Sequence, residues 1–340
     1  MADTTPRPVE IGLSLPNRAI FFGLTTETLL ECAQMAERSG QFGSVWVGDN
    51  LVSKPRLEAV VLLGAVATVT KSVRLGTVCL ASFPMRNPLV FGLQWASLDV
   101  LSGGRTHLVV CSGGPASYGP KYAAELAATG VASKERVGRV EEGITVLRRL
   151  WSEDEVVHEG RYYQLPGVTL EPKPAQAHVP IDIAVNPPPT AAPEVVEKAL
   201  RRVARLADGW QTDGTPPDVF RERWDAVRQY AREYGREDAV RTSSLHLMVN
   251  INDNPDAAWD EAFDFLDRYY GFGPAHLLSP ERKEKLQAWI ANGSPEQVAA
   301  KIQAFIDAGC TTPILRFCAP DPREQLRRCI EEVLPLVRRA

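Results

Sequence analysis

The residues best suited to chemistry follow an apolar segment early in the chain. Asp49 and Asn50 come directly after Ser44–Gly48, a short segment rich in valine and tryptophan that predicts a buried strand. A carboxylate accepts hydrogen bonds, and an amide both donates and accepts them. We therefore predict Asp49 and Asn50 as the catalytic pair. The alternative is that Asp49 caps the next element and Asn50 fills a turn, where both residue types are common.

Small and polar residues also occur at or soon after the ends of three later strands. We predict that they bind a ligand; they are Ala81, Ser82, Ser112, Gly113, Gly114, Tyr118, Val185 and Asn186. The paired glycines let a ligand approach the backbone closely. Asn186 is followed by three prolines, which cannot lie inside a sheet or a helix and so predict a rigid loop. The alternative is that these segments are ordinary turns and strand exits.

Composition and charge exclude several classes of protein. The formal net charge is -4, and no basic cluster is interleaved with aromatic residues, so we expect no nucleic-acid partner. No segment has the length of a membrane span or the pattern of a signal peptide, so we expect a cytoplasmic protein without a membrane partner. The six cysteines form no CxxC pair, and the histidines show no metal-binding spacing. We expect no metal site, no disulfide, and reduced, mostly buried thiols.

The elements that must position these residues alternate between short apolar runs and longer amphipathic stretches. This order is typical of βαβ units around a parallel sheet. Runs such as VRLGTVCL are almost continuously apolar, as expected for strands covered on both faces. Eight strands are predicted, which favours a closed (β/α)8 (TIM) barrel of class α/β: Val9–Ser14, Ser44–Gly48, Val73–Leu80, Thr106–Cys111, Ile181–Val185, Gly209–Thr212, Ser243–Asn250 and Thr312–Phe317.

The amphipathic stretches between the strands predict helices that cover the barrel. They are Thr25–Ser39, Arg56–Thr70, Pro88–Leu101, Ser133–Trp151, Pro193–Ala207, Asp218–Tyr234, Pro255–Tyr270, Pro280–Ala291, Pro295–Asp307 and Arg323–Arg338. Glu155–Leu165 predicts a hairpin insertion outside the barrel, at about 152–170. Tyr269–Pro274 combines aromatics with two glycines and suits a lid, at about 268–280; a surface-packed loop is the alternative. We expect one domain over residues 1–340.

Several blocks of the sequence resemble the bacterial luciferase-like superfamily of flavin-dependent oxidoreductases. These blocks are LSLPN, WVGDN, RLGTVCLASFPMRNPLVFGLQWASLDVLSGGRTHLVVCSGG, RVGRVEEGITVLRRLWSEDEVVHEGRYYQL and RRVARLADGW. They cover most of residues 9–210. The resemblance implies a (β/α)8 barrel, often a homodimer, that holds FMN or the deazaflavin coenzyme F420 at the carboxyl-terminal mouth. Backbone amides would hold the cofactor phosphate there.

The resemblance also assigns roles to the predicted residues and exposes three departures. It implies a non-prolyl cis peptide behind the flavin ring, which we place at Ala81–Ser82. Many relatives carry a histidine where this chain has Asn50, and some deazaflavin-dependent relatives carry an acidic residue near Gly114. The phosphate-binding turn is usually rich in glycine, whereas Pro187 has no N–H to offer.

These departures predict a pocket without strong acids or bases that mainly orients a reactive cofactor. The first interpretation is a monooxygenase that uses O2 and reduced FMN, supplied by a partner flavin reductase, to oxidise a small organic substrate. The second is hydride transfer between coenzyme F420 and a small organic substrate. A non-catalytic flavin-binding relative is the third.

Overall fold

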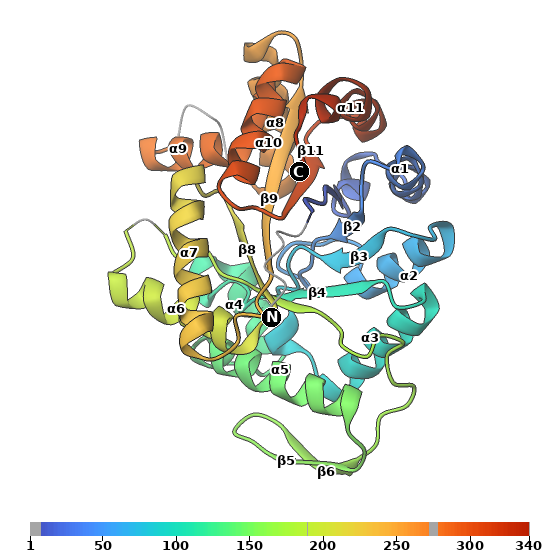
Figure 1. Ribbon diagram of the computed structural model, residues 1–340, viewed down its shortest axis with the longest axis vertical. Coiled ribbons are helices and arrows are strands. Elements are labelled where there is room, and N and C mark those ends of the chain that lie inside the picture. The colour runs from blue at the N-terminus through green and yellow to red at the C-terminus, as the bar shows by residue number, and fades with distance from the viewer. Residues whose placement is uncertain (1–7, 189, 272–277, 340) are drawn as a thin grey trace.

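The centre of the molecule is a closed ring of parallel strands (Figure 1). This computed structural model describes residues 8–188, 190–271 and 278–339. The strands pair in the order β1, β2, β3, β4, β7, β8, β9, β11, and β11 pairs again with β1. They are β1 (Gly12–Leu15), β2 (Ser44–Val47), β3 (Arg74–Thr77), β4 (Thr106–Val110), β7 (Ile181–Ala184), β8 (Gly209–Asp213), β9 (Thr242–Ile251) and β11 (Thr312–Phe317). The predicted (β/α)8 barrel is confirmed.

All eight predicted strands are present, each shifted by at most a few residues. Every residue of β1, β2, β4, β9 and β11 is buried, because helices cover the outside and side chains fill the inside. Strand β1 begins three residues later than predicted, at Gly12, and β3 ends three residues earlier, at Thr77 rather than at Leu80. The backbone therefore leaves the sheet early, at the edge where ligand-binding loops of such barrels begin.

Helices surround the barrel, and most follow the strand that precedes them (Figure 1). They are α1 (Thr26–Ser39), α2 (Ala59–Val69), α3 (Pro88–Ser102), α4 (Pro120–Ala128), α5 (Arg136–Ser152), α6 (Pro193–Leu206), α7 (Pro217–Glu233), α8 (Pro255–Tyr270), α9 (Pro280–Trp289), α10 (Pro295–Asp307) and α11 (Pro322–Arg328). Ser294 and Gln297 form a capping box at the start of α10. None of the described helices is long and apolar enough to cross a membrane.

Two helix predictions need correction, and one helix was not predicted. The predicted helix Pro280–Ala291 ends at Trp289, and β10 (Ile290–Gly293) extends the sheet by pairing with the distal half of β9. The predicted helix Arg323–Arg338 loses its α-helical pattern after Arg328 and continues as a π turn and a 3-10 turn. Helix α4 was not predicted. Tertiary pairing and packing decide these short segments, and periodicity alone does not reveal them.

The predicted hairpin is confirmed as β5 (Val156–Glu159) and β6 (Gln164–Val168), which pair antiparallel and project from the barrel (Figure 1). Glu142 on α5 anchors the hairpin by accepting hydrogen bonds from the backbone N–H groups of Tyr162 and Tyr163. In the predicted lid, residues 272–277 lie outside the described residues. Tyr269 and Tyr270 belong to the last turn of α8.

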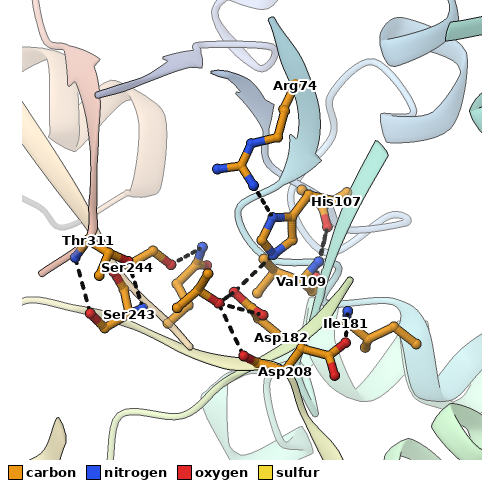
Figure 2. Close-up of polar contacts among 12 residues, drawn as sticks. Arg74, His107, Val109, Ile181, Asp182, Asp208, Ser243, Ser244 and Thr311 are labelled. Carbon is orange, nitrogen blue, oxygen red and sulfur yellow. Dashed lines mark hydrogen bonds and ion pairs between the residues drawn. The ribbon is translucent and has the colours of Figure 1, made fainter. Parts of the chain in front are cut away.

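The amino-terminal end of the barrel contains a network of paired charges (Figure 2). His107 on β4 lies with its Nε2 3.0 Å from a carboxylate oxygen of Asp182 on β7, although the angle is not that of a hydrogen bond. Arg74 on β3 bonds Glu10 at 2.8 Å. Asp208, just before β8, accepts a 2.8 Å hydrogen bond from the Ile181 N–H. The contacts of His107 and Asp208 connect neighbouring strands, and Arg74 reaches the segment before β1, two strands away.

Candidate active site

A cavity of about 480 Å³ opens at the carboxyl ends of the barrel strands. Its volume is within the range of small-molecule and cofactor sites. Nine of the ten predicted site residues line it: Asp49, Asn50, Ala81, Ser112, Gly113, Gly114, Tyr118, Val185 and Asn186. A second cavity, of about 590 Å³, lies at the opposite end beside the paired charges. We take the first as the candidate active site, because barrel enzymes place their chemistry at the carboxyl-terminal mouth.

The tenth predicted residue, Ser82, lies behind the cavity wall and fixes Asp49. The Ser82 N–H donates to one carboxylate oxygen of Asp49 at 2.7 Å, and Arg86 donates to the other at 3.1 Å. The same guanidinium donates to the Ser82 hydroxyl. Both oxygens of Asp49 therefore have partners within the protein. This arrangement favours a positioning role for Asp49, whose catalytic role remains a prediction.

The loop after β4 is shaped by the glycine pair that the sequence singled out. Gly113 has a φ of +64°, and a Cβ at this position would overlap the carbonyl oxygen of Ala81. Arg136 donates to the carbonyl oxygens of Ser112 and Gly113 and holds the loop from behind. A side chain at position 113 would thus push the two loops apart. Glycine instead lets the two loops lie close together at the wall of the cavity.

Two expectations about the cavity wall were wrong. The non-prolyl cis peptide joins Val78 and Cys79, not Ala81 and Ser82, because β3 ends three residues earlier than predicted. Cys79 also forms a disulfide with Cys111, where reduced thiols were expected. Because β3 and β4 are adjacent, the Cα atoms of Cys79 and Cys111 lie 6.1 Å apart, a distance that suits a disulfide. The spacing of 32 residues could not reveal this proximity. The other four cysteines are free and buried, as expected.

Asn186 lines the cavity, but its side chain is engaged in holding the loop after β7. Its amide donates to the carboxylate of Asp213 at 2.9 Å and accepts from Arg223 at 2.8 Å. Arg223 also donates to the carbonyl oxygen of Pro187. The proline-rich loop is therefore fixed by side chains from the neighbouring β8 and α7. A cofactor phosphate would find few backbone N–H groups in this loop.

The list of site residues predicted from the sequence does not include a group of basic residues on the other side of the cavity. We call Lys54, Arg56 and Arg316 the mouth cations, and all three line the cavity. The expectation of a pocket without strong acids or bases is therefore wrong. Arg316 lies within β11, the last strand, and becomes a neighbour of the β2 loop only when the barrel closes. The sequence already indicates Arg316, because an arginine at the end of the last predicted strand could reach the mouth and bind an anionic group, with a salt bridge in the barrel floor or wall as the alternative.

The loop that carries Lys54 is held by a buried carboxylate. Glu125 on α4 accepts hydrogen bonds from the N–H groups of Val52 at 2.6 Å and Ser53 at 2.7 Å. Asn17, from the LSLPN block, donates to the carbonyl oxygens of Gly48 and Leu57 and so holds the segment on both sides of Arg56. These contacts fix the backbone on which Lys54 and Arg56 stand.

The environment of Lys54 makes its charge sensitive to pH. Burial, followed by the charges of Arg56 and Arg18, lowers the pKa of Lys54 to about 8. Its Nζ lies 4.7 Å from the centre of the Tyr270 ring. At neutral pH the amine is mostly protonated, and a modest rise in pH releases the proton. Lys54 is therefore suited to donate or accept a proton in this cavity.

His246, on β9, completes this side of the cavity. Its pKa lies well below the usual value because of burial, with the charges of Arg316 and Arg56 adding to the effect. The imidazole is therefore neutral. Its Nε2 is buried and has no hydrogen-bond partner among the described residues. A buried nitrogen of this kind is costly to leave without a partner, which points to a ligand.

The fold and the cavity define a (β/α)8 barrel with a candidate ligand site at its carboxyl-terminal mouth. The sequence profile of the luciferase-like monooxygenase family matches residues 11–312. The chain belongs to this family and is an oxidoreductase.

Three relatives illustrate what the chain is similar to. A protein of Kineococcus radiotolerans, named F420-dependent glucose-6-phosphate dehydrogenase, is 26% identical over 99% of this chain and 100% of its own. An F420-dependent secondary alcohol dehydrogenase, solved with an F420–acetone adduct, superposes with a TM-score of 0.76 at 21% identity, over 97% of this chain and 99% of its own. The monooxygenase RslO1 of Streptomyces bottropensis gives 0.75 at 21% identity, over 96% and 99%. At such identities the two solved structures support the fold alone.

Proposed function

We propose that this protein is an oxidoreductase that uses coenzyme F420 to transfer a hydride between the cofactor and an alcohol or carbonyl group of a small organic substrate. The names of its relatives support F420 over FMN, since the Kineococcus protein, similar over the whole chain, is named for this cofactor. The barrel itself does not discriminate, because a monooxygenase shares it equally well. The choice therefore depends on the cavity.

The cavity has a wall suited to a flat ring system. Val78, Ala81, Ala184 and Val185 supply apolar surface, and the backbone at Gly113 leaves no room for a side chain. These residues would hold the ring, whether it is a deazaflavin or a flavin. When bound, the deazaflavin supplies a two-electron hydride donor or acceptor.

The observation that carries the proposal is Lys54 in the cavity. Oxidation of an alcohol releases a hydride and also a hydroxyl proton, so a hydride-transfer site needs a group that takes up this proton. The neutral amine of Lys54 can accept it, and the protonated amine can return it in carbonyl reduction, because the pKa of Lys54 is about 8. The histidine and the acidic residue that the family resemblance led us to look for are replaced here by Asn50 and Gly114.

The runner-up is a monooxygenase that uses O2 and reduced FMN supplied by a partner reductase. The shared fold of the Streptomyces monooxygenase is the observation in its favour. A cavity that contains several cations and a proton-transferring amine is less suited to it than the apolar cavity that the sequence suggested.

The purified protein should be titrated with F420, oxidised FMN and reduced FMN in parallel, without oxygen. We expect F420 to bind at least about tenfold more tightly than either form of FMN, a difference of about 1.4 kcal/mol. Anaerobic assays with F420 and a panel of secondary alcohols should then give reduced cofactor. Tight binding of reduced FMN with oxygen-dependent turnover would instead establish the monooxygenase, and binding of none would support a non-catalytic relative.

A further inference from the structure

We propose that the substrate of this enzyme is an organic anion, whose carboxylate or phosphate group binds to Arg56 and Arg316 beside Lys54. The proposal deepens the proposed function, because it names the substrate class of the same cavity. The claim that the anion is the substrate rests on the proposed function, whereas the claim that an anion binds here rests on the mouth cations alone.

The first observation is the environment of Arg316. Its side chain is fully buried, with 1% of its surface exposed, yet within the described parts of the chain no carboxylate lies within 4 Å of its guanidinium. Nε and Nη2 donate to the Ser14 hydroxyl at 3.1 and 2.7 Å, and Nη1 donates to the Tyr270 hydroxyl at 3.0 Å. All of these partners are neutral, and the guanidinium has more donors than these contacts use. A buried charge without a counter-ion is strongly unfavourable.

The second observation is that another guanidinium converges on the same point. A Cβ added at Gly48 would overlap Nη1 of Arg56 and lie 3.5 Å from Nη2 of Arg316. The guanidinium groups of Arg56 and Arg316 therefore lie beside the same glycine. Arg56 donates only to the carbonyl oxygen of Lys54 among the hydrogen bonds of the described residues. Like charges at this separation repel one another, and an anion between them would remove the repulsion.

The carboxylates of the cavity do not balance these charges. Asp49 is bound to Arg86 and to the Ser82 N–H. Asp213 accepts from Asn186 and raises the pKa of Lys54 only as a minor effect. The mouth cations therefore carry a net positive charge that, in the described part of the molecule, has no direct counter-ion.

The third observation is independent of charge. His246 places its buried, unpartnered Nε2 against the same cavity. A neutral imidazole can donate to or accept from a substrate hydroxyl or carbonyl group. An anion held by the arginines would thus bring the rest of a substrate within reach of both His246 and Lys54. The site recognises a molecule that carries an oxyanion at one end and a polar, reactive group nearby.

The test uses Lys54 as a reporter in the whole protein, without cofactor or turnover. The protein is treated with limiting acetic anhydride at pH 8 and constant ionic strength, with increasing inorganic sulfate in one arm and acetate in the other. Acetylation of each lysine is measured by peptide mass spectrometry. Lys301 is the internal control: burial lowers its pKa to about 8 as well, but it lies on α10 and donates to the Ile290 carbonyl oxygen.

We expect sulfate or acetate to reduce acetylation of Lys54 about fivefold at saturation, since a neighbouring anion raises the pKa of the amine by about one unit from about 8, and to leave Lys301 unchanged. The arm that protects at lower concentration identifies a phosphate-like or a carboxylate group. The variants Arg316→Met and Arg56→Gln should each require at least about tenfold more anion. Arg74→Gln, at the opposite end of the barrel, should behave as wild type.

Equal acetylation of Lys54 and Lys301 at all anion concentrations would overturn the proposal, as would protection that persists unchanged in both mouth variants. Competition between sulfate and bound F420 would also overturn it, because the cations would then bind the cofactor phosphate. Protection of Lys54 in a protein that binds no F420 would refute the proposed function while leaving the anion site intact. The two proposals can therefore fail separately.

Discussion

The two ends of the barrel use charged residues in opposite ways. At the amino-terminal end, Arg74 pairs with Glu10. His107 there lies against Asp182 (Figure 2). Arg148 there bonds Asp208 at 2.9 Å. At the carboxyl-terminal mouth, the mouth cations have no carboxylate within 4 Å among the residues that the structure describes.

This difference separates charges that stabilise the fold from charges that await a ligand. The pairs at the amino-terminal end join segments of the barrel to one another or, for Arg148, to helix α5, so these charges are paired without any other molecule. The mouth cations repel one another, and burial together with the charge of Arg56 lowers the pKa of Lys54, which weakens the empty barrel. Sites of function are where proteins tolerate such local costs.

The largest effect is expected when a pair at the amino-terminal end is broken. Asp208 accepts hydrogen bonds from Arg148 and from the Ile181 N–H, so Asp208→Ala leaves both without their partner. We expect the free energy of unfolding, measured by urea denaturation, to fall by about 3 kcal/mol. Asp238→Ala, at a mostly exposed pair with Arg241 at the same end, is the matched control and should cost less than about 1 kcal/mol. Equal losses of unfolding free energy in Asp208→Ala and Asp238→Ala would contradict a stabilising role of the Asp208 contacts.

Removing a mouth cation should have the opposite signature. Arg316→Met takes away a buried charge with no counter-ion, so the free energy of unfolding should fall less than in Asp208→Ala. The kcat/KM for the substrate should fall by roughly 100-fold, the equivalent of about 2.7 kcal/mol, because a hydrogen-bonding cation is lost from the site. A variant as unstable as Asp208→Ala with normal kcat/KM would show that Arg316 is structural.

The acid stability of the protein should depend on the amino-terminal end. Burial alone would raise the pKa of Asp208, but the charge and hydrogen bond of Arg148 outweigh it, so the pKa is lowered. A carboxyl with a lowered folded pKa stabilises the protein above its unfolded pKa of about 4, and this contribution is lost as the pH falls through the folded value. In acid titrations followed by circular dichroism, Asp208→Asn should therefore lose less stability than wild type. Parallel curves would contradict this role.

The smallest effect is expected at Gly48, where the two guanidinium groups meet. Gly48→Ala would displace the side chain of Arg56 and should weaken sulfate binding roughly threefold, the equivalent of less than 1 kcal/mol. Gly64→Ala is the matched control, because a Cβ there meets open space. It should leave sulfate binding unchanged and stabilise helix α2 by up to about 1 kcal/mol. Similar sulfate affinities in both variants would argue against convergence at Gly48.

The fold could be predicted from the sequence because strands and helices are encoded locally. Runs such as Thr106–Val110 are apolar throughout, and helix ends are marked by Ser294 and Gly40. Segments decided by tertiary packing were missed, as at Ile290–Gly293, where pairing with β9 replaces the predicted helix.

The candidate site was predicted only where it follows strand ends. Asn50 and Gly113 are marked by their position after an apolar run. Arg316 and His246 lie inside strands that meet the loop carrying Lys54 only when the barrel closes. The position of Arg316 at the end of the last strand indicates that it can reach the mouth, but nothing in the sequence indicates that Arg316 or His246 lies near Lys54. The disulfide of Cys79 was missed for the same reason, since it depends on which strands are neighbours.

The central claim is that the mouth cations await an anion, and calorimetric titration of the cofactor-free protein with inorganic sulfate at pH 8 tests it most directly. Lys54 is about half protonated at this pH, so a bound anion should draw a proton onto it. The titration is measured in two buffers of different ionisation enthalpy, so that proton uptake can be calculated. We predict that one sulfate binds per chain with net uptake of protons, and that the binding and the proton uptake are both abolished in Arg316→Met. Absence of binding, or binding without proton uptake, would contradict it.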